Sequence, residues 1–110
     1  VRTVALAQAS LPVTGPDNGV TLAMTLIDSV DIPKGTVRQA TPNGDNYDVT
    51  VWSVVGDTQR LRYYFRTYDN KNWFMVDVAR ALNDAKAPAA IPVGGQPSYT
   101  DVTGTAHPVQ

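Results

Sequence analysis

Positively charged, aromatic and hydroxyl side chains alternate with apolar residues between residues 34 and 66. Cations bind phosphates, aromatic rings stack on unpaired bases, and hydroxyls hydrogen-bond base edges or ribose. The members of this polar-face set are Lys34, Thr36, Arg38, Asp48, Thr50, Trp52, Thr58, Arg60 and Arg62. Alternation alone favours a solvated sheet face with ordinary cross-strand packing, whereas the clustering of Trp52 between Lys34 and Arg60 indicates binding of single-stranded RNA.

The expected strand register places this set on one face of a sheet. Opposite residues on neighbouring strands share a face, so the parity of each connecting loop decides which side chains meet. A seven-residue loop, 40–46, and a three-residue loop, 55–57, keep the apolar odd positions together. The resulting cross-strand rows are Lys34–Trp52–Arg60, Thr36–Thr50–Arg62 and Arg38–Asp48–Tyr64. They gather cations and an aromatic ring on the face opposite the apolar one.

Patterns for catalysis or metal binding are missing from the sequence. It has no cysteine and no glutamate, and its one histidine, His107, precedes Pro108 in a loop-like segment. Asp28 and Asp31 are close enough in sequence to bind a cation weakly, although a solvated turn is the favoured interpretation. Neither a phosphate-cradling glycine loop nor a paired-carboxylate motif is present. The sequence therefore predicts no enzyme, no cofactor and no metal site.

Composition bounds the remaining choices. The 110 residues carry a net charge of −1 and are 43% hydrophobic, which is typical of one globular domain. No stretch of about 18 apolar residues is present, so no membrane contact is expected. Without cysteine there are no disulfides, and the redox compartment stays open. We expect one domain over residues 1–99 and a tail over residues 100–110.

The elements that must position the polar-face set follow from periodicity. Alternating and β-branched runs predict strands, and apolar residues at helical spacing predict one later helix. The expected strands are 2–10, 20–27, 36–39, 47–55 and 58–68, and the expected helix is 72–86, capped by Asp69 or Asn70. The pattern predicts an α+β fold with an N-terminal β-hairpin and a C-terminal helix packed on one face of an antiparallel sheet.

Three segments carry a resemblance to a known family. These are "VRQ" followed by seven residues and "Y-x-V-x-V", then "YYFRTYDNKNWFMVDVARALNDA", and finally "AAIPVGGQPSY". Together they resemble the coat proteins of small single-stranded RNA bacteriophages, over roughly residues 36–99. The loop at 55–57 is shorter than that of the best-known relatives, and eleven residues follow Tyr99, where relatives end.

The resemblance implies a structural capsid protein, not an enzyme. It implies an antiparallel sheet of about five strands completed in a homodimer, many dimers closing into an icosahedral virus-like particle, and binding of viral RNA on the inner sheet face. Alignment with the family puts RNA contacts on the polar-face set. The expected location is the virion, with the bacterial host cytoplasm during assembly, and repression of translation through an RNA hairpin stays open.

The expected helix is too short to cover a five-stranded face alone, so its apolar residues are expected to bury across a dimer. These interface residues are Phe74, Val78 and Leu82. Two other resemblances remain open. "VTVWSVVGDTQRLRYYF" is similar to a hairpin in the outer domain of flagellar hook proteins, an extracellular filament module. "WFMVDVARAL" is similar to part of phage antirepressor DNA-binding domains, small nucleic-acid-binding regulators.

Overall fold

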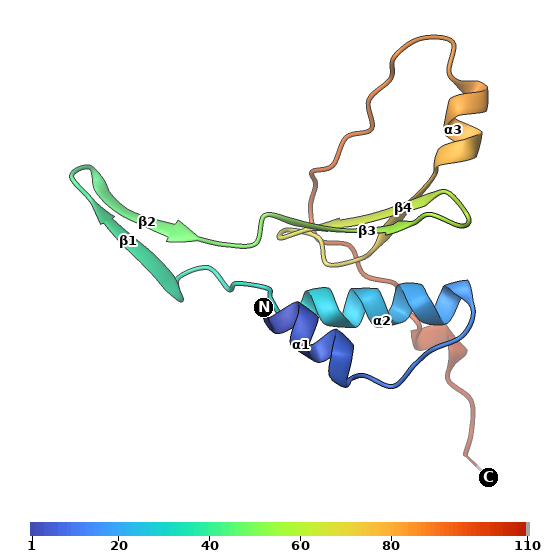
Figure 1. Cartoon of the computed structure of the whole chain (residues 1–110), viewed down its shortest axis with the longest axis horizontal. Helices are drawn as coiled ribbons and strands as arrows, with labels where there is room; N and C mark the ends of the chain where they lie inside the picture. Colours follow the sequence, from blue (N-terminus) through green and yellow to red (C-terminus); the bar gives the residue numbers. More distant parts are fainter. Residues whose placement is uncertain (110) are drawn as a thin grey trace.

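Two antiparallel sheets and three α-helices are arranged along the chain in the computed structural model, which describes residues 1–109 (Figure 1). The α+β class expected from the sequence is confirmed. The elements are α1 (Arg2–Ala9), α2 (Pro16–Asp28), β1 (Val37–Thr41), β2 (Gly44–Asp48), β3 (Trp52–Asp57), β4 (Arg62–Thr67), β5 (Phe74–Asp77), α3 (Val78–Asp84) and the 3-10 turn η1 (Thr103–Thr105).

The N-terminal region is helical, so the expected β-hairpin of strands 2–10 and 20–27 is wrong. Helix α2 begins at Pro16, whose fixed φ suits a first helical position, with Asp17 in the first turn. Its exposed residues Thr21, Thr25 and Asp28 recur at intervals of four and three, which is helical spacing. β-branched residues suggested a strand, but packing of the opposite helical stripe on the sheet overrides their propensity.

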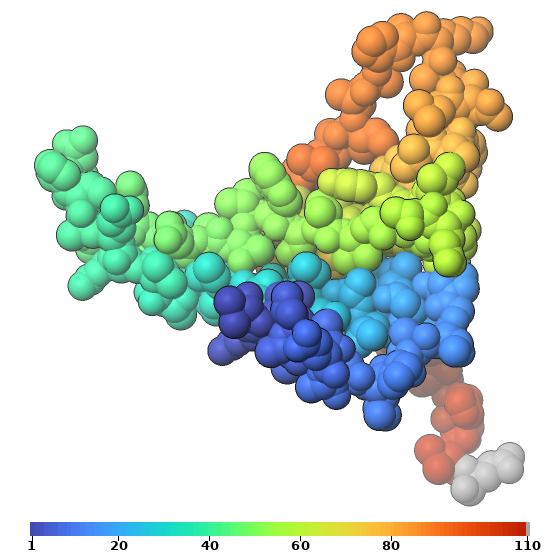
Figure 2. Space-filling view, viewed as in Figure 1, coloured from blue at the N-terminus to red at the C-terminus, as the bar shows by residue number. Residues whose placement is uncertain are grey.

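Strands β1 and β2 form a hairpin closed by the two-residue turn Pro42-Asn43. The register pairs Val37 with Asp48 and Arg38 with Tyr47, so the expected seven-residue loop is wrong. Gly44 has φ of 117°, which glycine adopts without the strain that a side chain brings. The hairpin projects away from the rest of the molecule, and no other helix or strand of residues 1–109 lies against it (Figures 1 and 2).

Strands β3, β4 and β5 form the second sheet, in that order. The expected strand 47–55 is split, because Thr50 exchanges hydrogen bonds with Ile32 instead of extending β2. A four-residue turn, 58–61, joins β3 to β4, and Trp52 therefore pairs with Thr67 and Val54 with Phe65. The structure thus has five strands in two sheets, in place of the single sheet of about five strands that was expected.

The two faces of the second sheet differ in composition. The register places Trp52, Val54, Tyr63, Phe65, Thr67, Phe74 and Val76 on one face, called the pocket face. The other, called the α2 face, carries Ser53, Val55, Asp57, Arg62, Tyr64, Arg66, Met75 and Asp77. Helices α1 and α2 lie below the α2 face in Figure 1, and α3 and the chain after it stand above the pocket face.

The expected helix 72–86 is a strand followed by a shorter helix. β5 ends at Asp77, whose carboxylate accepts a hydrogen bond from the Arg80 backbone N–H and caps α3. The expected caps, Asp69 and Asn70, lie in the β4–β5 turn instead. Within residues 1–109, no helix has the length and apolar content needed to cross a membrane.

Candidate functional site

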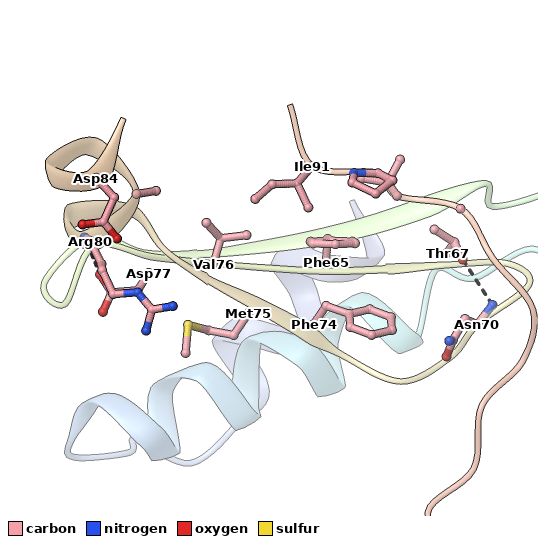
Figure 3. A pocket seen from close by; sticks show the side chains of 14 residues that line it. Phe65, Thr67, Asn70, Phe74, Met75, Val76, Asp77, Arg80, Asp84 and Ile91 are labelled. Atoms are coloured by element: carbon pink, nitrogen blue, oxygen red, sulfur yellow. Dashed lines mark hydrogen bonds between the residues drawn. The ribbon is translucent and has the colours of Figure 1, made fainter. Parts of the chain in front are cut away.

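A pocket of about 440 Å³ lies on the pocket face, within the size range of small-molecule sites. One wall is the sheet, another is α3, and the third is the irregular segment after α3, residues 85–98, which we call the strap (Figures 1 and 3). The lining residues are Phe65, Thr67, Asn70, Phe74, Met75, Val76, Asp77, Arg80, Ala81, Asp84, Ile91, Pro92, Val93 and Gly94. The pocket is therefore assembled from residues up to 29 positions apart in sequence, from Phe65 to Gly94.

The floor of the pocket is aromatic and aliphatic. Phe65 and Phe74 stand opposite each other on β4 and β5, with ring centroids 5.5 Å apart in a stacked arrangement. Ile91 of the strap lies across from Phe65 and Val76 in Figure 3. Phe65 is one of two buried apolar side chains among the described residues, whereas Phe74 is 42% exposed. This part of the pocket can bind an apolar body.

The other end of the pocket carries charge. Arg80 and Asp84 reach it from α3, and Asp77, which the register places on the α2 face, reaches it at the end of the edge strand β5 (Figure 3). Asp77 is held by its cap bond to the Arg80 backbone N–H, at 3.0 Å. The guanidinium of Arg80 makes no ion pair with any residue of 1–109. Arg80 can therefore bind an anionic group of a ligand, and the carboxylates of Asp77 and Asp84 can accept hydrogen bonds from hydroxyl or N–H groups.

Asn70 fixes the rim between the sheet and the strap. Its Nδ2 donates to Ser98 Oγ at 3.0 Å and to the Gln96 carbonyl at 3.3 Å, and its backbone N–H donates to Thr67 Oγ1 at 3.1 Å. Its Oδ1 accepts from the Asn72 backbone N–H at 3.0 Å, and Asn72 Nδ2 in turn donates to Ser98. Asn70 is 7% exposed. A single buried amide thus joins the β4–β5 turn to the end of the strap.

On the opposite side of the sheet, ion pairs attach α2 to the α2 face. Arg66 Nη2 lies 2.8 Å from Asp31 Oδ2 and also contacts the carboxylate of Asp28. The Arg66 guanidinium sits 4.7 Å from the ring centroid of Trp73, within range of a cation–π interaction. Ser53 Oγ donates to Asp31 at 3.5 Å. These contacts hold α2 and the segment that follows it against the sheet through Arg66.

A second ionic contact joins the β3–β4 turn to the start of α2. Arg60 Nε lies 2.6 Å from Asp57 Oδ2, and Arg60 Nη1 lies 2.7 Å from Asp17 Oδ1. The side-chain hydrogen bond from Arg60, followed by the bond from the Arg60 backbone N–H, lowers the pKa of Asp57 below 3.8. The same pairing raises the pKa of Arg60.

The polar-face set does not gather on one face. Lys34 and Thr36 lie in the turn before β1, Arg38 on β1, Asp48 on β2, Thr50 between β2 and β3, Trp52 on β3, Thr58 and Arg60 in the β3–β4 turn, and Arg62 on β4. None of the three expected cross-strand rows forms. Trp52 belongs to the pocket face and Arg62 to the α2 face, because the four-residue turn reverses the parity. Lys34 and Trp52 line one surface hollow together with Val93 of the strap.

The expected interface residues are also separated. Phe74 lies in the pocket on β5, whereas Val78 and Leu82 lie on α3. They do not form one helical stripe, since Phe74 precedes the helix. Their burial across a dimer stays a prediction.

Residues 1–109 do not assemble a hydroxyl–histidine pair of the kind that activates a nucleophile. His107 Nδ1 lies 3.4 Å from the Thr105 carbonyl, and the histidine contacts no hydroxyl side chain. Within the same residues no cluster of three or more metal-ligating side chains exists. What the described chain offers is a binding pocket with an apolar floor and a charged end.

Comparison with known proteins decides the family. The family model of linear amide C–N hydrolases, choloylglycine hydrolase family, matches residues 1–89. The chain belongs to this family. The match covers α1 to α3 and the sheet wall of the pocket. No curated protein matches the chain.

Membership of the choloylglycine hydrolase family overturns the functional expectations from sequence. The resemblance to RNA bacteriophage coat proteins is wrong, and so are the capsid function and the filament and regulator alternatives. The family consists of enzymes, so the expectation of a non-enzyme is wrong as well. RNA binding by the polar-face set rested on the expected register and on the coat resemblance; the structure removes the first support and the family match removes the second.

The pocket residues were not predicted from the sequence because the boundary between β5 and α3, at Asp77, was not recognised. The run Trp73-Phe74-Met75-Val76 is typical of a strand, and Asp77 is a typical N-cap before Val78–Asp84. Reading Asp77 as a cap divides the segment correctly and places Phe74 and Phe65 on neighbouring strands. Nothing in the local sequence indicates that the strap returns over them, since Asn70 and Ser98 are 28 residues apart.

Proposed function

We propose that this chain serves the hydrolysis of linear amide C–N bonds and that its pocket binds the amide substrate. In this reaction water adds to the carbonyl carbon and the C–N bond breaks, giving a carboxylic acid and an amine. The observation that carries the proposal is the family match over residues 1–89, which contains all the pocket residues of β4, β5 and α3. The pocket's apolar floor and charged end support it.

The family name suggests choloylglycine as the first substrate to try. This amide has a large, mostly apolar ring system that carries hydroxyl groups, and its side chain ends in a glycine carboxylate. Phe65, Phe74 and Ile91 suit the ring system. Arg80, at the charged end of the pocket, suits the carboxylate.

Calorimetric titration of the full chain tests the proposal. Choloylglycine is expected to bind, and its two halves, cholate and glycine, are expected to bind more weakly because neither spans the pocket. The variant Arg80→Gln is expected to bind choloylglycine about tenfold more weakly, a loss of about 1.4 kcal/mol. Lys86→Gln is the matched control, since Lys86 lies beyond α3 and outside this pocket. Equal losses in both variants, or no binding by the parent chain, would overturn the assignment.

A further inference from the structure

We infer that Asn70 is a positioning residue that latches the strap over the pocket and thereby sets the width of ligand that the pocket takes. This inference rests on the proposed function, because it concerns the same pocket. It assigns to Asn70 a role in selecting ligands and not in the chemical step.

The first support is the geometry of the latch. Asn70 Nδ2 reaches both Gln96 and Ser98, and Asn72 reaches Ser98 from the same turn. The backbone of Asn70 is itself held by Thr67 Oγ1. Because Asn70 is 7% exposed, its own bonds to Gln96 and Ser98 are partly protected from competing water, whereas those of Asn72 are exposed. The end of the strap is therefore fixed relative to β4.

The second support is that the strap itself is exposed and has no regular secondary structure. Residues 85–98 contain no helix or strand, and every one of residues 85–98 is exposed. Yet Ile91, Pro92, Val93 and Gly94 form one wall of the pocket. Because the strap packs little along its length, its position is set by its two ends. One end continues from α3, and the other is held by the hydrogen bonds of Asn70, which we call the Asn70 latch. Figure 1 shows the strap arching between these two points.

The consequence for binding follows from preorganisation. A slim ligand depends on a wall that is already close, so a loosened strap costs it affinity. A bulky ligand fills the pocket and positions the wall itself, so it loses less. Removing the latch should shift preference toward the bulkier amide.

The experiment compares choloylglycine with the slim amide N-lauroylglycine by calorimetry. In Asn70→Ala the affinity ratio is expected to shift about fivefold toward choloylglycine, the effect of losing roughly one net hydrogen bond. Ser98→Ala, which removes the acceptor side chain, is expected to shift it in the same direction. Asn83→Ala is the matched control, because Asn83 is exposed on α3 and makes no side-chain hydrogen bond within residues 1–109. A ratio unchanged in Asn70→Ala would overturn the selecting role.

A second readout follows the strap directly. The chain has no cysteine, so a nitroxide attached at Ala89→Cys reports from the strap alone. Its rotational mobility is expected to rise when Asn70→Ala is added and to stay unchanged with Asn83→Ala. Unchanged mobility in the first case would overturn the latch. If the parent chain bound neither amide, the proposed function would fail and the selecting role with it, whereas the mobility would still decide whether Asn70 holds the strap.

Discussion

The two faces of the β3–β4–β5 sheet show how one set of strands can serve structure on one side and binding on the other. On the α2 face, Arg66 is paired with Asp28 and Asp31, and Asp57 is paired with Arg60 of the β3–β4 turn, which also contacts Asp17. On the pocket face, aromatic side chains remain partly exposed and Arg80 remains unpaired within residues 1–109. A paired charge cannot readily take a ligand, whereas exposed rings and a free cation can. We therefore expect substitutions on the two faces to have separable effects.

The largest expected effect is on stability and comes from the α2 face. Arg66→Ala is expected to lower the free energy of unfolding by roughly 2–3 kcal/mol, because it leaves the carboxylate of Asp31 without its buried partner. Arg62→Ala on the same face is the control, since Arg62 makes no ion pair within residues 1–109, and it should change stability by less than about 0.5 kcal/mol. Urea unfolding followed by circular dichroism measures both. Similar losses in the two variants would show that the ion pairs are not what holds α2.

The next effect is on binding and comes from the pocket face. Phe74→Ala removes an exposed ring that stacks on Phe65, and it is expected to weaken choloylglycine binding about tenfold, or about 1.4 kcal/mol. Tyr47→Ala removes an aromatic ring of similar exposure from the β1–β2 hairpin and should leave binding unchanged. Calorimetric titration of the two variants makes the comparison. If Tyr47→Ala weakened binding as much, the pocket would not be the site.

The smallest effect is a dependence on acid. The pKa of Asp57 is lower in the folded chain than its ordinary 3.8, so the unfolded chain binds the proton more tightly. The stabilisation from Asp57 is therefore complete above pH 3.8 and is lost as pH falls through the lowered pKa. Stability measured between pH 5 and pH 2 should fall more steeply in the parent than in Asp57→Asn. If the stability of the parent and of Asp57→Asn fell in parallel over this pH range, the contact between Arg60 and Asp57 would not contribute to stability in acid.

The sequence predicted the fold class but not which side chains share a face of the β3–β4–β5 sheet. Strands around Val54 and Phe65 were expected correctly from their β-branched and aromatic residues. Their register was not, because a turn of four residues in place of three moves every side chain of β4 to the other face. Turn length depends on local contacts such as the Asp57 carboxylate accepting from Gln59 and Arg60, which alternation does not reveal.

The N-terminal helices and the pocket had different reasons for being missed. In α2, Val20, Thr21 and Thr25 favour a strand locally, and the helix is decided by packing against β3. The pocket depends on contacts such as Asn70 with Ser98, far apart in sequence. Only the match to a family over residues 1–89, and not any single motif, identifies the chemistry.

The strap has a further consequence for the medium in which the pocket works. From Ala87 to Ser98 the strap carries no charged side chain, and the groups that hold its end are amides, hydroxyls and a carbonyl. Dissolved salt screens partly exposed ion pairs such as Asp17 with Arg60, but it has little effect on neutral hydrogen bonds. The strap should therefore keep its position from low to high salt concentration. The ion pairs that attach α2 to the sheet should weaken as ionic strength rises.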